Sequence, residues 1–282
     1  MHHEHPRSRL RGQPNLPRKD FSVTTFGIIG VGSIASSIVT GLCESVASPP
    51  QIVLSPRSES RSKDLAARFQ SARVASSNQE VVDQSDVIVL CVLPHQAEEV
   101  FGQLRFREDQ PVVSAMAGVS LSVLRDLLAP ATDIARSIPA PAVVTRSSIT
   151  PIYPATAAAR DLYDRLGGCL EIDNEVAYKS VSAASATVEA YFHYLGAVAD
   201  WLSAHGIDGK DARRYVAATF SELSEEMNTD DVDFGALARA HTSEGGLNEQ
   251  FARHLASTGT FTAISEGLDA VLARLAPAGA TA

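Results

Sequence analysis

Cysteine and long apolar segments are scarce in this sequence, and their absence excludes two classes of protein. Only 3 cysteines occur in 282 residues. They are odd in number, widely spaced and in apolar contexts, which is typical of reduced core cysteines and not of a disulfide framework. No apolar run approaches the ~20 residues of a spanning helix, and the N-terminus lacks the apolar segment of a secretory signal. We therefore expect a cytoplasmic protein without a membrane partner.

The sequence also lacks an excess of basic charge and any group of residues spaced as metal ligands. The formal net charge is −9, which disfavours nucleic acid as a partner. Basic residues gather near the N-terminus, where we predict a disordered tail over residues 1–22. Some of the histidines lie in that tail and the others are scattered, so the sequence predicts no metal site.

A glycine-rich turn is the feature that organises the first half. A strand-like apolar stretch runs into Gly30-Val31-Gly32-Ser33-Ile34-Ala35, a G-x-G-x-x-A pattern followed by a helix-compatible run. Gly30 lets the chain turn sharply, Gly32 lets backbone N–H groups approach a pyrophosphate, and Ala35 lets the helix pack closely on the strand. The N-terminus of that helix supplies unpaired donors. We therefore expect Gly30, Gly32, Ser33, Ile34 and Ala35 to bind a dinucleotide.

The second predicted strand, residues 51–55, bears on the choice of cofactor. In an NAD-binding fold its end usually carries an acidic residue for the ribose hydroxyls. Here it ends in Ser55-Pro56-Arg57-Ser58, with Arg61 soon after. Ser55, Arg57 and Ser58 are predicted cofactor residues, because Arg57 and Ser58 suit a 2′-phosphate. We expect NADPH, with NADH possible; the alternative is that Arg57 and Arg61 are solvated surface charges.

Strands alternate with helices up to about residue 173. Further strands are predicted over residues 72–75, 85–92, 111–116, 134–139 and 148–153. This alternation predicts an α/β, Rossmann-type, doubly wound parallel sheet in a domain spanning residues 23–173. Open sheets bind ligands at strand C-termini. Val92 at the end of one strand, Leu93 and Pro94 just after it, and Ala117 and Gly118 after another strand are therefore cofactor candidates. His95 is left open between a proton donor and a surface group.

The pattern becomes helical in the second half, predicting an all-α domain over residues 174–282. Apolar residues repeat every three or four positions over 181–202, which predicts one long amphipathic helix ended by Gly206. Further helices are predicted over 212–227, 234–240, 247–255 and 261–275. Their apolar stripes need a partner surface, and both a subunit interface and a self-contained bundle fit this pattern.

A second glycine pair lies between two of these helices. Ser243-Glu244-Gly245-Gly246-Leu247-Asn248 precedes a helical pattern, so its free N–H groups suit a carboxylate. An ordinary turn between helices is the alternative.

The order of these motifs, from about Thr24 to Leu275, resembles that of the pyrroline-5-carboxylate reductase family. The motifs are the glycine turn, Ser55-Pro56-Arg57-Ser58, Val92-Leu93-Pro94, Ser114-Ala115-Met116-Ala117-Gly118-Val119, Arg136-Ser137-Ile138-Pro139, Ala190-Tyr191 and Thr242-Ser243-x-Gly245-Gly246. The resemblance implies a helical domain that intertwines with a second subunit, giving a homodimer or larger homo-oligomer. It also implies NAD(P)H-dependent reduction of a small imino acid, a cyclic imine, to proline.

The resemblance suggests the substrate residues, and the departures from it leave the substrate open. Ser243, Gly245 and Gly246 are expected to hold the substrate carboxylate, and Asn248, where the family has threonine, to lie near the imine nitrogen. Glu244 and Thr187 are further candidates that also depart from the family's motifs.

Three alternatives to this substrate remain. One is reduction of another imine or carbonyl compound. Another is a 3-hydroxy acid dehydrogenase that uses Lys179. The third is a non-catalytic NADPH-binding regulatory protein.

Overall fold

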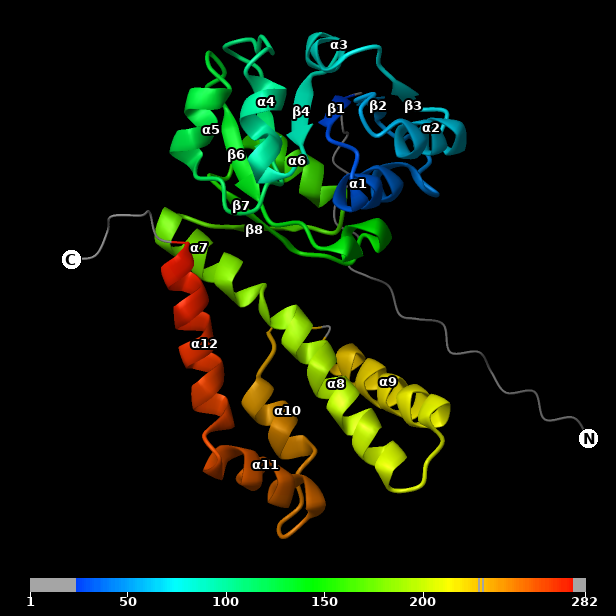
Figure 1. The fold of residues 1–282 in the computed structure, drawn as a ribbon, viewed down its shortest axis with the longest axis vertical. Helices are drawn as coiled ribbons and strands as arrows, with labels where there is room; N and C mark the ends of the chain where they lie inside the picture. Colours follow the sequence, from blue (N-terminus) through cyan, green and yellow to red (C-terminus); the bar gives the residue numbers. More distant parts are fainter. Residues whose placement is uncertain (1–23, 228, 230, 276–282) are drawn as a thin grey trace, which may run out of the picture. The chain divides into compact units, whose positions relative to one another are not determined.

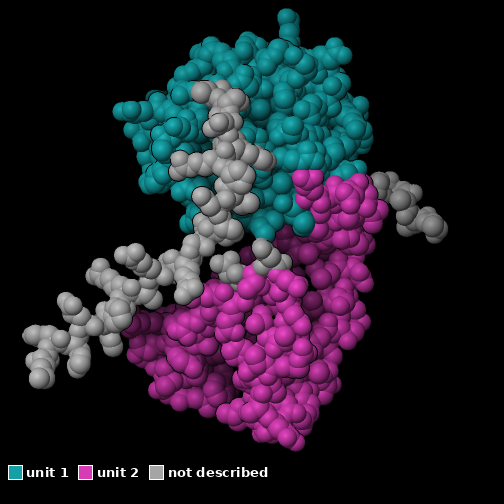
Figure 2. Space-filling view, turned by 180° about the vertical axis from the view of Figure 1, so that it is seen from behind, with its two compact units in different colours: residues 1–170 teal, residues 171–282 magenta. Residues whose placement is uncertain are grey.

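The computed structural model describes residues 24–227, 229 and 231–275. Two compact units, residues 1–170 and 171–282, are each described by themselves (Figures 1 and 2). The tail predicted over residues 1–22 lies outside the described residues.

Unit 1 is built on an eight-stranded sheet with the strand order β3-β2-β1-β4-β5-β6-β7-β8. The strands are β1 (Thr25–Ile29), β2 (Gln51–Leu54), β3 (Ala72–Val74), β4 (Val87–Leu90), β5 (Val112–Ser114), β6 (Ile134–Ser137), β7 (Thr150–Tyr153) and β8 (Cys169–Glu171). The chain reverses its direction of progress across the sheet between β1 and β4, as the predicted doubly wound sheet requires. The sheet departs from the prediction at β7, which runs antiparallel to β6, and at β8, which was not predicted.

Helices cover both faces of this sheet (Figure 1). The helices and helical turns of unit 1 are α1 (Ser33–Cys43), α2 (Glu59–Arg68), α3 (Asn78–Asp83), η1 (Pro94–Gln96), α4 (Ala97–Phe101), α5 (Leu121–Leu127), η2 (Pro141–Thr145) and α6 (Ala157–Asp164). Val87 and Val89 of β4 pack in one apolar cluster with α1, α2 and α6. Ile88 and Leu90 pack in a second cluster with α3, α4 and α5. Side chains alternate between the two faces of a strand, so β4 is buried on both.

Unit 2 is helical, as predicted. Its helices are α7 (Glu175–Ala184), α8 (Thr187–Ala204), α9 (Gly209–Glu226), α10 (Phe234–Ala240), α11 (Leu247–Ser257) and α12 (Thr260–Arg274). Of the described helices, none is long and apolar enough to cross a membrane.

The prediction of one long helix over residues 181–202 is wrong, because the chain breaks between α7 and α8. The Ser185 hydroxyl donates to the Ser182 carbonyl, and the Thr187 hydroxyl donates to the Ala184 carbonyl. Such hydroxyl bonds compete with helical backbone bonds, and the Ala186 N–H turns to the Ala183 carbonyl, three residues back.

The sequence analysis predicted that the helical stretch ends at Gly206, and the end of α8 at this glycine is confirmed. Gly206 has φ +95°, a left-handed conformation that favours glycine. Its N–H donates to the Ser203 carbonyl, and the Ile207 N–H donates to the Leu202 carbonyl. This pair of bonds is a Schellman motif, which satisfies carbonyls at the end of α8.

Candidate functional site

A cavity of about 470 Å³ opens in unit 1 at the carboxyl ends of β1, β2 and β4. It therefore lies at the point where the strand order reverses, the position at which open α/β sheets bind ligands. Its lining residues are Ile29, Gly30, Val31, Gly32, Ser33, Ser55, Arg57, Ser58, Arg61, Asn78, Cys91, Val92, Leu93, Gln96 and Val100. The structure thus brings together eight of the predicted cofactor residues: Gly30, Gly32, Ser33, Ser55, Arg57, Ser58, Val92 and Leu93.

Gly30 makes the sharp turn that leads from β1 into α1. Its φ is +91°, and a Cβ there would lie 2.7 Å from Val92 Cγ1 and 2.8 Å from the Cys91 carbonyl carbon. Its N–H donates to Ser55 Oγ at 3.0 Å, so the buried hydroxyl of Ser55 ties this turn to β2. Both the backbone conformation and the close approach of β4 require glycine at this position.

Gly32 faces open space at the N-terminus of α1. A Cβ there would meet nothing within 4 Å, so the protein itself does not require glycine at this position. No side chain caps α1, and its first turn has no acidic residue. The first N–H groups of α1 and its partial positive charge therefore face an open cradle that suits a phosphate.

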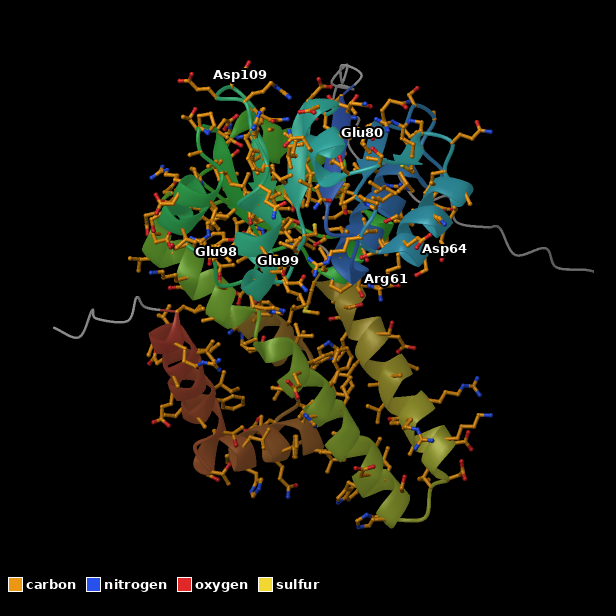
Figure 3. The ribbon with its side chains drawn as sticks, turned by 45° about the horizontal axis from the view of Figure 1, so that its top comes forward. Arg61, Asp64, Glu80, Glu98, Glu99 and Asp109 are labelled. Carbon is orange, nitrogen blue, oxygen red and sulfur yellow. The ribbon has the colours of Figure 1, made fainter. Side chains whose placement is uncertain are left out.

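The glycine turn and the start of α1 form the first wall of the cavity. The segment after β2 forms the second wall, which carries positive charge. Arg57, Ser58 and Arg61 all line the cavity. Arg57 Nη1 lies 3.8 Å from Glu99 Oε1 of α4. Figure 3 labels Arg61 of α2 and Glu99 of α4. Two guanidinium groups and a hydroxyl form a donor set that suits a phosphate monoester.

Asn78, which the sequence analysis missed, also lines the cavity. Its Oδ1 is buried and accepts no hydrogen bond from a described residue, and a buried acceptor of this kind needs a partner. Ser77 Oγ accepts from the Glu80 N–H at 3.1 Å and so caps α3. Glu80 in turn accepts from the Ser76 N–H at 2.8 Å, and these bonds orient the segment that carries Asn78. The Ser-x-x-Glu spacing over residues 77–80 was the available sequence signal.

Bonds from Ser76 and Arg73 hold the pKa of Glu80 down at about 2, so its carboxylate stays charged.

The third wall is formed by the end of β4 and the start of α4. Cys91 and Val92 lie at the β4 end, and Gln96 and Val100 complete this side. Burial raises the pKa of the Cys91 thiol to about 12, so it stays protonated at neutral pH. This wall is therefore uncharged and largely apolar.

Five predicted cofactor residues do not line the cavity. Ala35 is fully buried and packs with Phe26 of β1 in the first core cluster, and Ile34 packs against that cluster. Pro94 begins η1 and is exposed. Ala117 and Gly118 are exposed in the loop after β5.

In unit 2, the predicted substrate residues Ser243, Glu244, Gly245, Gly246 and Asn248 lie together in the turn between α10 and α11. The backbone N–H groups of the glycine pair are already engaged. The Gly245 N–H donates to Glu249 Oε2 at 2.7 Å, and the Gly246 N–H donates to the Ser243 carbonyl at 2.9 Å. Asn248 Nδ2 donates to the His241 carbonyl at 2.7 Å.

Hydrogen bonds from the Gly245 N–H and from Arg253 lower the pKa of Glu249, which favours its charged form beside the glycine pair.

Thr187 begins α8, and its hydroxyl donates to the Ala184 carbonyl at 2.8 Å. It adjoins an open hollow in unit 2 that is lined by Ser185, Ala186, Val188, Glu189, Phe192 and His193. None of the residues of the 243–248 turn lines this hollow.

Two family models match separate parts of the chain. Residues 25–118 match the model described as NADP oxidoreductase, coenzyme F420-dependent. Residues 175–277 match the model described as pyrroline-5-carboxylate reductase dimerisation. The first match contains every residue that lines the cavity, and the second contains α7 to α12.

Named relatives cover nearly the whole chain. It is 28% identical over 266 residues to the pyrroline-5-carboxylate reductase of Pseudomonas aeruginosa, covering 90% of this chain and 97% of the relative. It is 27% identical over 244 residues to that of Methanosarcina acetivorans, with coverages of 83% and 90%.

Solved structures agree with these relatives. The 1-pyrroline-5-carboxylate reductase of Streptococcus pyogenes superposes with a TM-score of 0.74 at 26% identity, covering 89% of this chain and 98% of that one. The Plasmodium falciparum pyrroline carboxylate reductase, solved with NADP bound, has the same fold, with a TM-score of 0.74 at 16% identity and coverages of 89% and 97%.

Proposed function

Because this chain belongs to the pyrroline-5-carboxylate reductase family, we propose that it reduces the C=N bond of a cyclic imine with NADPH. The observation that carries the proposal is the cavity at the ends of β1, β2 and β4, with its glycine turn on one wall and its two arginines on another. The open glycine turn and the two guanidinium groups support a phosphorylated dinucleotide as the ligand.

The proposed binding mode assigns one role to each wall. The first N–H groups of α1 and the open side of Gly32 hold the pyrophosphate, because a ligand can approach there without meeting a Cβ. Arg57, Ser58 and Arg61 hold the 2′-phosphate. Asn78 offers its side-chain amide to the adenosine portion. Cys91 to Leu93 support the remainder of the cofactor beside β4.

Reduction of an imine asks for positioning more than for acid–base chemistry. When bound, the dihydronicotinamide supplies the hydride, which a protonated imine accepts most readily. The chain's own task is to fix both rings within reach and to exclude alternative poses. Cys91 takes no part as a nucleophile, because its thiol stays protonated.

The substrate end of the proposal rests on the turn at residues 243–248. A substrate carboxylate would accept from the Gly245 N–H and the Ser243 hydroxyl, with the Asn248 amide near the imine nitrogen. The Gly245 N–H is held by Glu249, so an incoming carboxylate has to displace a carboxylate of the chain itself. Pyrroline-5-carboxylate, the substrate named for the relatives, is the first compound to test.

We also propose that the protein works as a homodimer or a larger homo-oligomer. The match of the helical unit to a dimerisation model supports self-association. So does the exposure of its large apolar side chains, which include Val188, Tyr191, Phe192, Trp201, Phe251, Phe261 and Ile264.

A substrate panel tests the proposed reaction. NADPH oxidation is followed with pyrroline-5-carboxylate, with 1-pyrroline, which lacks the carboxylate, and with acyclic imino acids and carbonyl compounds. Turnover of pyrroline-5-carboxylate supports the assignment. Turnover confined to 1-pyrroline or to a carbonyl compound favours the alternative of a related reductase, for which Glu244 and Glu249 beside the glycine pair are the supporting observation. NADPH binding without any turnover would overturn the reductase proposal in favour of a binding protein.

A 3-hydroxy acid dehydrogenase is tested separately through Lys179. Its Nζ lies 3.9 Å from Glu175 Oε1, one turn earlier in α7. We expect Lys179→Ala to retain imine reduction. Loss of all activity with intact NADPH binding would instead favour the assignment as a 3-hydroxy acid dehydrogenase.

A further inference from the structure

The mouth of the cofactor cavity carries an ion pair that the proposed binding mode does not use. Arg57 lines the cavity, and its Nη1 lies 3.8 Å from Oε1 of Glu99. None of the described residues that line the cavity is acidic. Glu99 therefore brings negative charge, from just outside the lining, to a guanidinium assigned to the 2′-phosphate.

The pair joins two separate walls of the cavity. Arg57 lies in the segment that follows β2, and Glu99 belongs to α4, which follows β4. These two strands flank β1 on opposite sides. Gln96 and Val100, on either side of Glu99 in the sequence, both line the cavity. The Arg57–Glu99 pair therefore reaches from the β2 wall to the β4 wall at the cavity mouth.

A 2′-phosphate and Glu99 cannot both use Arg57 fully. The phosphate competes with the Glu99 carboxylate for the Arg57 guanidinium, and two anions beside the same guanidinium repel each other. A 2′-hydroxyl brings no such charge, and it leaves the ion pair in place. Glu99 therefore opposes NADPH binding and leaves NADH binding nearly unaffected.

On this basis, and resting on the proposed use of a nicotinamide dinucleotide, we propose that Glu99 is a specificity-determining residue that narrows the preference for NADPH over NADH. Glu99 acts through Arg57, because its carboxylate competes with the 2′-phosphate for the Arg57 guanidinium.

The pair is exposed, which separates this role from a structural one. The side chains of Arg57 and Glu99 are 51% and 74% exposed. Exposed pairs of this kind contribute little to folding. Glu99→Gln should accordingly leave the melting temperature unchanged, and its effect should appear in cofactor binding.

The test compares binding of two cofactors and two fragments to the full-length protein. Dissociation constants of NADPH, NADH, 2′,5′-ADP and 5′-AMP are measured by calorimetry for wild type and Glu99→Gln. We expect Glu99→Gln to bind NADPH and 2′,5′-ADP about three- to tenfold more tightly, with NADH and 5′-AMP changed less than about twofold.

Glu98→Gln is the matched control. Glu98 is the preceding residue of α4, and both glutamates are labelled in Figure 3. Glu98 is exposed and forms no ion pair with a described residue. The Glu98→Gln substitution removes the same charge from the same helix. In this variant the ratio of the NADH to the NADPH dissociation constant should stay at the wild-type value. An equal change in both variants, or no change in Glu99→Gln, overturns the role of Glu99.

The outcomes also separate this inference from the proposed function. If wild type binds NADPH and reduces an imine while Glu99→Gln keeps the wild-type cofactor ratio, only the role of Glu99 fails. If Glu99→Gln shifts the ratio but no imine is reduced, the inference stands and the reductase fails. If neither protein binds NADPH or 2′,5′-ADP, both are overturned.

Discussion

Two glycines of one turn serve different purposes. Gly30 is required by the protein, because its φ is positive and Cys91 and Val92, just after β4, leave no room for a Cβ. Gly32 has free space around it, so the fold does not require glycine there, and we propose that the cofactor does. Replacing each by alanine separates folding from binding.

We predict that Gly30→Ala destabilises the fold by about 1–3 kcal/mol, since it combines backbone strain with a clash. Gly32→Ala should keep more of the free energy of unfolding and weaken NADPH binding at least about tenfold, because its methyl group enters the phosphate cradle. Urea unfolding and calorimetry measure the two quantities. Equal loss of stability in both variants would contradict this division.

The capping carboxylate of Glu80 predicts a dependence of stability on pH. Its pKa is lowered from 4.5 to about 2 in the folded protein, so the folded state binds fewer protons than the unfolded state between these values. The stabilisation is therefore complete above the unfolded pKa and is lost as the pH falls towards about 2. The difference in unfolding free energy between wild type and Glu80→Gln should be larger near neutral pH than at about pH 3. An equal difference at both pH values would count against the capping role.

At this scale, the residues found from the sequence were those within one motif. Gly30, Gly32, Arg57 and Ser58 are recognisable because a glycine turn and a strand end have local signatures. Asn78 was missed, since its place in the lining of the cavity and its buried Oδ1, which has no partner among the described residues, depend on segments that are distant in the sequence.

Among the elements, the turn before α11 is the one to which we assigned the substrate carboxylate. Its Gly245 N–H donates to the carboxylate of Glu249 in α11, which the neighbouring Arg253 also contacts at 2.6 Å. Under that proposal, Glu249 occupies the position that a substrate carboxylate would take.

We predict that Glu249→Gln lowers the KM for pyrroline-5-carboxylate about three- to tenfold, because it replaces a charged competitor by a neutral amide. The KM for 1-pyrroline should change less than about twofold, since that compound has no carboxylate to place; it is the internal control. A parallel change for both substrates in steady-state assays would remove Glu249 from any role in carboxylate recognition.

The main elements were predictable because their periodicity is strong. β4 and β5 have continuous apolar runs, and α12 repeats apolar residues at helical spacing. β8 escaped prediction, since three residues that are half-buried or exposed give no alternation. The break between α7 and α8 also escaped, because serine and threonine hydroxyls interrupt the helix without glycine or proline.

At the scale of the whole molecule, unit 2 has too little core for its apolar content. Among the described residues of this unit, the buried apolar ones are Tyr178, Ala183, Ala199, Ala212 and Val216. By contrast, Phe192 of α8 is 63% exposed. Side chains of this size are normally covered by another surface. The match of this unit to a dimerisation model supports our proposal that a second copy provides that surface.

We predict that Phe192→Asp shifts the protein to a smaller species in light scattering and lowers its melting temperature, because a charge in an apolar interface goes unpaired. Val123→Asp, a similar change at an exposed position of α5 in unit 1, should leave the assembly unchanged. If both variants keep the wild-type mass, the α8 surface is not the subunit contact.

The central position of β1 and β4 in the sheet predicts how slowly their amide hydrogens exchange with solvent. These strands pair with each other at the centre of the sheet and are buried on both faces, so their amide hydrogens should exchange with solvent only when unit 1 unfolds as a whole. Amide hydrogens at the floor of the cavity should therefore exchange most slowly in unit 1. Arg57 and Glu99, by contrast, lie exposed at the mouth of the cavity. If the dinucleotide binds as proposed, it should slow exchange at the start of α1 and in α4 far more than in β1 or β4.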